Sequence, residues 1–248
     1  MANLIGRMNR VFDKYDVKMT YFISTYLIAD HPSFFEHFED HDFGPHGHLH
    51  LDYSLVGKRT AFQDMKNSIL IFKKLNLNPW IFRAPYGVTK IEKSDNLFFE
   101  YENTLGIRHD SSINLGGRPL NQPPYIIKHK CGVTSIPFVG VADDYLIDNL
   151  ALNDNNEILH RFAKVFDYCR TGILVYDMHP IRMGQARYIE ILEALIKQMI
   201  KEKNSIIMSL KEAFSRFDKK DEDETIVCFT GDIDNLSILD YFKRFKTW

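Results

Sequence analysis

The chain has 248 residues, with 31 basic and 33 acidic side chains and therefore a formal charge of −2. This balance argues against a general nucleic-acid binder, and a hydrophobic fraction of 45% is too high for a disordered chain. No apolar run approaches the ~20 residues of a membrane-spanning helix, and residues 1–15 lack a signal-peptide pattern. Cys131, Cys169 and Cys228 are widely spaced and form neither a zinc pattern nor a disulfide framework, so we expect a cytoplasmic protein.

Helical and extended patterns alternate along the chain. Hydrophobic periodicity predicts helices over residues 4–12, 31–39, 56–75, 96–105, 155–169, 187–201 and 210–217. Short buried runs predict strands over residues 17–24, 42–44, 79–82, 106–109, 172–176 and 205–208, with a hairpin over 125–128 and 133–138. This alternation indicates an α/β fold with a parallel sheet, either open and doubly wound or closed into a barrel.

A charged segment, residues 218–224, separates these elements from a last unit of the chain. Its composition predicts a solvated linker. Residues 225–230 after it predict a strand, residues 231–235 a turn that carries two acids, and residues 236–245 a helix. We therefore expect one domain over residues 1–248, in which residues 225–248 add a strand–helix unit.

Three histidines, His46, His48 and His50, lie within five residues. Imidazole is a common ligand of zinc and similar divalent ions. Histidines four residues apart face the same way on a helical turn, so His46 and His50 form one candidate ligand pair. A His-x-His pair that includes His48 is the alternative, and the competing interpretation is a polar loop in which histidines occur by chance.

Other chemically capable side chains follow predicted strands. Asp232 and Asp234 follow the last strand, and in α/β folds such positions face the ligand crevice, although the second acid is also suited to capping a helix. Arg83 is the first residue of the segment Arg-Ala-Pro-Tyr-Gly, and its guanidinium could pair with a carboxylate. The Pro-Tyr-Gly part is either an ordinary turn or a turn that directs a backbone N–H into a site. His179 follows another strand and is a candidate general acid or simply a loop residue.

Together these motifs resemble the polysaccharide deacetylase family, the NodB homology domain of carbohydrate esterase family 4. The matching segments occur in family order: His46-Gly-His-Leu-His50, Arg83-Ala-Pro-Tyr-Gly87 and Leu174-Val-Tyr-Asp-Met-His179-Pro180. The resemblance implies a distorted (β/α) barrel with about seven parallel strands.

The sequence departs from the family pattern in the position of its acidic motif. The family carries this motif on its first strand, whereas here the good match, Asp232-Ile-Asp234, lies near the C-terminus. We interpret this order as a circular permutation in which the C-terminal segment supplies the first family strand, which is feasible because the termini of a domain are often adjacent.

The resemblance also implies a metal centre and a catalytic base. Asp234, His46 and His50 would bind one divalent cation, with zinc as the expected metal. Asp232 would take a proton from water, and Arg83 would pair with Asp232 and keep it ionised.

The same resemblance implies roles for four further residues. The backbone N–H of Tyr86 would stabilise the oxyanion, and Tyr86 would also line the substrate site. His179 would protonate the leaving amine. Asp177 would belong to the substrate site and would orient His179 or point into the barrel, and Asp110 would hold a sugar hydroxyl or His179.

The implied function is a metal-dependent hydrolase that removes acetyl groups from the N-acetylated sugars of a polysaccharide or its precursor. The expected partner is an N-acetylated glycan or a lipid- or nucleotide-linked sugar used in surface polysaccharide biosynthesis, with no nucleic acid and no membrane segment. Two alternatives are a catalytically inactive carbohydrate-binding relative and a hydrolase of small cyclic amides or ureides.

Overall fold

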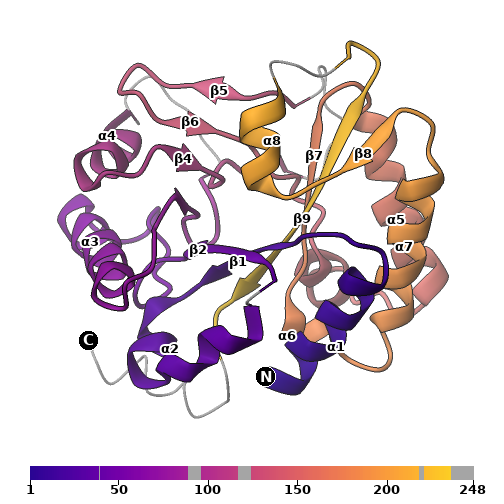
Figure 1. Ribbon diagram of the computed structural model, residues 1–248, viewed down its shortest axis with the longest axis horizontal. Helices are drawn as coiled ribbons and strands as arrows, with labels where there is room; N and C mark the ends of the chain where they lie inside the picture. Colours follow the sequence, from indigo (N-terminus) through magenta and orange to yellow (C-terminus); the bar gives the residue numbers. More distant parts are fainter. Residues whose placement is uncertain (39, 89–95, 117–123, 218–220, 236–248) are drawn as a thin grey trace.

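The computed structural model describes residues 1–38, 40–88, 96–116, 124–217 and 221–235 (Figure 1). Its helices are α1 Ala2–Lys14, α2 Thr25–Asp30, α3 Lys58–Lys74, α4 Asn96–Leu105, α5 Asn155–Tyr168, α6 Pro180–Met183, α7 Ile189–Lys201 and α8 Leu210–Arg216, with a 3₁₀ helix η1 Pro32–Phe38 and a π-helical turn η2 Tyr145–Asn149. Its strands are β1 Thr20–Ile23, β2 Asp42–Pro45, β3 Ile81–Phe82, β4 His109–Asp110, β5 Ile127–Lys128, β6 Thr134–Ser135, β7 Ile173–Asp177, β8 Ser205–Ile207 and β9 Thr225–Ile233.

The described strands form two sheets, and β9 is central to the first. In that sheet the order is β2-β1-β9-β7, with β8 also paired to β9, and every pairing is parallel. The second sheet has the order β3-β4-β6-β5, in which only β5 is antiparallel. The expected α/β fold with a parallel sheet is therefore confirmed.

Single backbone hydrogen bonds connect the two sheets at two places. The Arg83 N–H donates to the Pro45 carbonyl between β3 and β2, and the Val139 N–H donates to the Val175 carbonyl beside β7, each at 3.3 Å. Close approach of β2 and β3 requires Gly44, because a Cβ there would lie 2.8 Å from the Ile81 carbonyl oxygen. No strand ladder closes the ring among the described residues, so the barrel itself stays a prediction.

The core has a layer between the sheets and a larger one outside the first sheet. The inner layer joins Phe22 of β1 and Ile81 of β3 to side chains of β7, β9 and α8. The outer layer packs the opposite face of β1, β7 and β9 against α1, α5 and α7, which lie along one side of the molecule in Figure 1. Burial of both faces explains why the first sheet is parallel and apolar.

The alternation of side chains along β9 directs two polar residues inward. Ile226 and Cys228 belong to the inner layer, whereas Val227, Phe229 and Ile233 belong to the outer one. Because side chains of a strand alternate between faces, Thr230 and Asp232 continue the inward row of Ile226 and Cys228. The predicted turn over residues 231–235 is therefore wrong in its first half, since β9 continues to Ile233.

Gly231 allows β9 to remain a strand at this point. A Cβ at Gly231 would lie 2.6 Å from the Met178 carbonyl oxygen and would also collide with the Met19 side chain. The absence of a side chain thus lets neighbouring backbone approach β9 directly before Asp232.

The remaining predicted elements agree with the structure to within a few residues, with three exceptions. The sequence prediction missed α2, α6 and η2, which have four to six residues each. The predicted helix over residues 236–245 and residues 218–220 of the predicted linker lie outside the described residues. None of the described helices combines the length and apolarity needed to cross a membrane.

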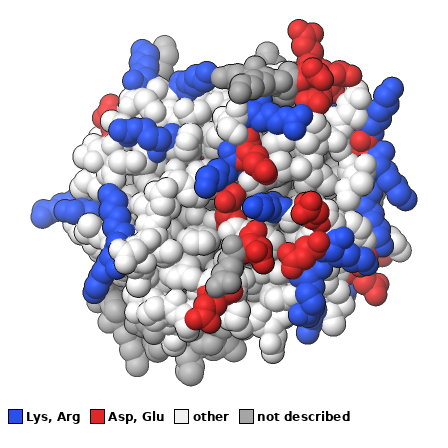
Figure 2. All heavy atoms as spheres, viewed as in Figure 1, with Lys and Arg blue, Asp and Glu red and all other residues white. Residues whose placement is uncertain are grey.

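The face drawn in Figure 2 carries both basic and acidic side chains. They are interspersed over the described part of this face rather than gathered into a continuous basic patch. This distribution agrees with the nearly balanced charge of the chain.

Candidate active site

The histidine loop follows β2 and is held by an acid from α3. The main-chain N–H groups of His48 and Leu49 donate to the Asp64 carboxylate at 2.8 and 2.9 Å. Gly47 and His50 adopt left-handed backbone conformations, with φ of 68° and 53°. The loop is therefore a fixed bend and not the helical turn that the four-residue spacing suggested, and the sequence analysis missed the role of Asp64.

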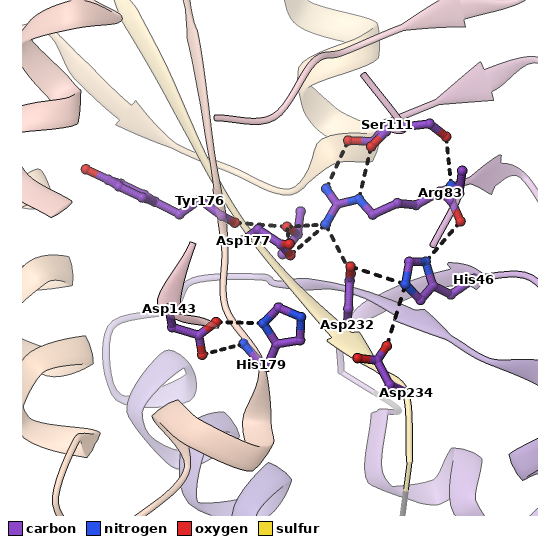
Figure 3. A network of polar contacts seen from close by, with 12 residues as sticks. His46, Arg83, Ser111, Asp143, Tyr176, Asp177, His179, Asp232 and Asp234 are labelled. Carbon is purple, nitrogen blue, oxygen red and sulfur yellow. Dashed lines mark hydrogen bonds and ion pairs between the residues drawn. The ribbon is translucent and has the colours of Figure 1, made fainter. Parts of the chain in front are cut away.

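The loop brings His46 and His50 close to Asp232 and Asp234 at the end of β9, and Figure 3 shows His46 beside both acids. His50 Nε2 lies 2.9 Å from Asp234 Oδ1, and His46 Nε2 lies 3.6 Å from the same oxygen. His46 Nε2 also lies 3.4 Å from Asp232 Oδ2. Residues nearly two hundred positions apart thus form one cluster, because β9 pairs with β1 and β1 pairs with β2.

The protonation state of His46 suits metal binding. Its Nδ1 donates to the Arg83 carbonyl at 3.0 Å, which directs the lone pair of Nε2 toward Asp234. Burial, together with the charge of His50, lowers the pKa of His46 to about 3. His46 is therefore neutral at physiological pH, as a metal ligand must be.

The residues present fit a divalent cation. Asp234 Oδ1 is buried and lies 2.9 Å from His50 Nε2, but it receives no hydrogen bond of normal geometry from the described residues. Burial favours the neutral acid, but the charge of His50 and its contact outweigh that effect and hold the pKa of Asp234 well below its usual range. Two imidazoles and one carboxylate, with their ligand atoms within 4.8 Å of one another, form a donor set suited to zinc or a similar ion.

His48 does not belong to this group. Its Nδ1 forms a hydrogen bond with the Thr25 hydroxyl at 3.0 Å, on the other side of the loop. The alternative ligand pair that included His48 is therefore wrong, and the pairing of His46 with His50 is the one that the structure contains.

Arg83 is completely buried and pairs with two acids at once. Its Nη1 donates to Asp177 at 2.7 Å, to Asp232 at 3.1 Å and to the Thr230 hydroxyl at 2.8 Å. The guanidinium lies between the rings of Phe22 and Phe138, at 4.1 and 4.7 Å from their centroids. The predicted pairing of Arg83 with Asp232 is present, and Asp177 and Thr230 are additional partners.

The two acids compete for one guanidinium. Burial and the charge of Asp232 raise the pKa of Asp177 to about 6, although Arg83 works in the opposite direction. Burial also raises the pKa of Asp232, again against the effects of Arg83 and His179. Asp232 is thus a carboxylate whose proton affinity exceeds that of an exposed aspartate, which is useful in a general base.

His179 is oriented by Asp143, a residue that the sequence analysis missed. Asp143 Oδ1 lies 2.6 Å from His179 Nδ1, and Asp143 Oδ2 accepts the main-chain N–H of His179 at 2.8 Å (Figure 3). Burial works against the charged ring, but Asp143 outweighs it and raises the pKa of His179 well above its usual range. His179 is therefore a protonated donor. The adjacent acids Asp143 and Asp144 were the sequence signal that could have located this partner.

Asp177 points between the sheets and not at His179 Nδ1. It lies on the same face of β7 as Ile173 and Val175, which belong to the inner layer. Asp143, and not Asp177, therefore orients His179. The other expectation for Asp177, that it points inward, is the one observed.

Tyr86 lies at the rim of the cluster. Its backbone is left-handed, with φ of 62°, and its side chain is 58% exposed. Its ring packs against the ring of His50 with centroids 4.9 Å apart. The turn after Arg83 therefore carries an aromatic surface to the edge of the proposed metal site.

Asp110 has a different place from the one expected. It is fully buried, and its carboxylate accepts from the Ser112 N–H at 3.0 Å and from the Ser135 hydroxyl at 2.8 Å. It therefore offers no surface to a sugar hydroxyl and does not contact His179, so both expected roles for Asp110 are corrected.

The comparisons with known proteins concern the family and the fold. Residues 3–108 match the model of the polysaccharide deacetylase family. No curated protein matches the chain. Similar solved structures include a candidate polysaccharide deacetylase of Mycobacterium smegmatis, with 17% identity, a TM-score of 0.69 and coverage of 89% of this chain and 80% of that one.

Two further structures differ in activity. The Puue allantoinase has 17% identity, a TM-score of 0.62 and coverage of 79% of this chain and 66% of that one. A carbohydrate esterase family 4 pseudoenzyme of Bacillus anthracis has 15% identity, a TM-score of 0.53 and coverage of 94% and 60%. At these identities the likeness concerns the fold. The family match covers residues 3–108, less than half of the chain, and over that part the chain is similar to polysaccharide deacetylases.

Proposed function

We propose that the protein is a metal-dependent hydrolase that removes acetyl groups from N-acetylated sugars of a glycan or a glycan precursor. The observation that carries this proposal is the placement of the His46–His50–Asp234 ligand group beside a base, Asp232, and a histidine whose pKa is raised, His179. A family match to polysaccharide deacetylases supports the substrate class.

The ligand group would hold a divalent cation, for which we propose zinc. When bound, such an ion supplies Lewis-acid chemistry, because it polarises an amide carbonyl and lowers the pKa of water. Asp232 would accept a proton from the attacking water at one carboxylate oxygen. Arg83 holds the other oxygen at 3.1 Å and so fixes the direction in which Asp232 points.

His179 would supply the proton that the departing nitrogen needs. An amide nitrogen cannot leave as an anion, so the C–N bond breaks as that nitrogen is protonated. Asp143 fixes His179 Nδ1, which leaves Nε2 as the donor. Water, an amide and these two proton transfers then yield acetate and a free amine.

The turn after Arg83 would stabilise the developing oxyanion. We propose that the main-chain N–H of Tyr86 donates to this oxygen, since the left-handed conformation of Tyr86 sets the direction of its peptide groups. One such donor contributes about 3–4 kcal/mol in other hydrolases.

The order of motifs supports a circular permutation, which we propose as the origin of this chain. The acids that family members carry on their first strand here come from β9, after all the other motifs. In the structure β9 occupies a place beside β1, where a preceding family strand would lie.

The decisive experiment measures acetate release by the zinc-loaded protein. The substrates are chitooligosaccharides, a peptidoglycan fragment, a nucleotide-linked N-acetyl sugar and a lipid-linked one, with allantoin as a ureide. Asp232→Asn is the matched variant, expected to lose turnover by about 10²- to 10⁴-fold while it retains the metal. Release of acetate by the wild type and not by this variant supports the proposal.

Two results would contradict it. Binding of the sugars without acetate release would indicate an inactive carbohydrate-binding relative, whereas turnover of allantoin alone would indicate a ureide hydrolase. Undiminished activity of Asp232→Asn would exclude Asp232 as the base.

A further inference from the structure

The segment Asp110-Ser111-Ser112, at the end of β4, contacts Arg83 along the edge of its guanidinium that faces away from the acids. Arg83 Nε donates to the Ser111 carbonyl and Nη2 donates to the Ser111 hydroxyl, each at 3.0 Å. Both acceptors are neutral, so the positive charge of Arg83 stays available to Asp177 and Asp232 on Nη1.

The same segment also holds the main chain on both sides of Arg83. The Ser111 N–H donates to the Phe82 carbonyl at 2.9 Å, which lies directly before Arg83. The Ala84 N–H, directly after Arg83, donates to the Ser112 hydroxyl at 2.8 Å. Arg83 is therefore fixed at its side chain and at both flanking peptide groups by two consecutive residues, Ser111 and Ser112.

Asp110 fixes the Ser112 hydroxyl in the orientation that this contact needs. The hydroxyl donates its proton to Asp110 Oδ2, so its lone pair is left to accept from Ala84. The Ser112 N–H donates to both carboxylate oxygens, at 3.0 and 3.1 Å. The Ser135 hydroxyl donates to Asp110 from β6 at 2.8 Å and forms no hydrogen bond with the described residues of the Arg83 turn.

A second buried acid faces Asp110 from α4. Both oxygens of Glu102 are buried and receive no hydrogen bond that satisfies normal geometry from the described residues. Burial, followed by the charge of Asp110, raises the pKa of Glu102 well above its usual range. Burial raises the pKa of Asp110 as well, but the hydrogen bonds from Ser112 and Ser135 oppose that effect, so Glu102 is the acid of this pair that favours the protonated form more strongly.

We infer that Asp110, Ser111 and Ser112 are positioning residues for Arg83, and through Arg83 for the base Asp232. This inference deepens the proposed function and rests on it for its effect on turnover. Misplacement of a catalytic group by about 1 Å can lower a rate by 10²-fold, so loss of one such contact has a measurable consequence.

The test compares two buried serines that both donate to Asp110. Ser112→Ala removes the acceptor of the Ala84 N–H, whereas Ser135→Ala removes a hydroxyl of the same kind without touching the Arg83 turn. The first readout is the ¹⁵N-detected Nε–H resonance of Arg83 and its exchange rate with solvent, assigned by its loss in Arg83→Lys. This NMR measurement requires neither catalytic activity nor bound metal.

We expect Ser112→Ala to shift the Arg83 resonance and to accelerate its exchange at least about tenfold, while Ser135→Ala leaves both within about twofold. The second readout is acetate release by metal-loaded protein. There we expect kcat of Ser112→Ala to fall at least about tenfold with KM and bound metal unchanged, and kcat of Ser135→Ala to stay within about twofold. Ser111→Ala, which removes the Nη2 acceptor, should follow Ser112→Ala in both readouts.

An unchanged Arg83 resonance in both Ser111→Ala and Ser112→Ala would overturn the inference, whatever the activity. Equal losses in Ser112→Ala and Ser135→Ala would also overturn it, because they would show a general loss of stability. If the wild type releases no acetate from any substrate, the proposed function fails, and the resonance of Arg83 still decides whether the segment positions it.

Discussion

Asp143 holds His179 at two points, with one carboxylate oxygen 2.6 Å from the ring Nδ1 and the other 2.8 Å from the main-chain N. The contact at the main chain fixes where His179 lies, and the contact at the ring fixes which nitrogen faces the substrate. Because Asp143 is buried, its charge acts on His179 with little screening by water.

This contact predicts a shift in the pH dependence of turnover. A general acid must be protonated, so activity is lost as the pH rises through the pKa of His179, which Asp143 raises. Asp143→Asn removes that charge, lowers the pKa of His179 and moves the alkaline limb of the kcat/KM profile to lower pH. Asp167→Asn, a change on the exposed part of α5, should leave the limb in place. An unmoved limb in Asp143→Asn would exclude His179 as the group that titrates there.

Removal of Asp234 is expected to empty the metal site. Asp234→Ala loses the only carboxylate of the proposed ligand group, and two imidazoles alone hold a divalent ion poorly. We expect the affinity for zinc to fall at least about 10²-fold, measured by competition with a chromogenic chelator. Asp232→Asn serves as the control on the same strand and should bind zinc nearly as the wild type does. Equal zinc affinity of Asp234→Ala and the wild type would contradict the assignment.

The buried Glu102 predicts a pH-dependent stability. Its pKa is raised in the folded protein, so its contribution is complete below its unfolded pKa of about 4.5 and is lost as the pH rises toward its folded pKa. Glu102→Gln cannot ionise, so the stability of this variant relative to the wild type should increase from about pH 5 to about pH 9. Urea unfolding at both pH values measures the difference, with the exposed Glu100→Gln as control. A constant difference would show that Glu102 is ionised in the folded state.

The close approach of backbone at Gly231 predicts sensitivity to one added methyl group. In Gly231→Ala the new Cβ would lie 2.6 Å from the Met178 carbonyl oxygen, so backbone must move. We expect the free energy of unfolding to fall by about 1–3 kcal/mol. Gly57→Ala, where a Cβ would meet nothing within 4 Å, should change it by less than about 0.5 kcal/mol. Thermal unfolding of the two variants tests this, and equal midpoints would contradict it.

The order of the main elements was predictable because hydrophobic periodicity is a local signal. Helices such as α3 and α5 and strands such as β7 lie where apolar spacing places them, within a few residues. The short helices α2, α6 and η2 carry too few residues for a period to show. The extension of β9 through Gly231 was missed because glycine usually marks a turn, and only its neighbours Met19 and Met178 explain its presence within a strand.

The residues of the candidate site also fall into a group that the sequence predicted and a group that it missed. His46, His50, Arg83, Asp232, Asp234 and His179 were named from motifs and strand ends, and the structure brings them together. Asp143, Asp64 and Ser111 were missed, because a supporting residue is recognised only by what it contacts in three dimensions. Asp110 was given a substrate role for the same reason, since no local pattern distinguishes a buried carboxylate from an exposed one.

The central place of β9 also imposes an order on biosynthesis. While the ribosome makes this chain, β1 and β7 are complete long before β9 emerges, and each has an unpaired edge where β9 will later form its ladder. Until then the nascent polypeptide has two unpaired strand edges that could pair with other chains. His46 and His50 are already synthesised at this stage, whereas Asp232 and Asp234 are not. Chaperone binding at this stage would protect the nascent chain from aggregation, because β9, the last described strand, is the one that joins β1 to β7.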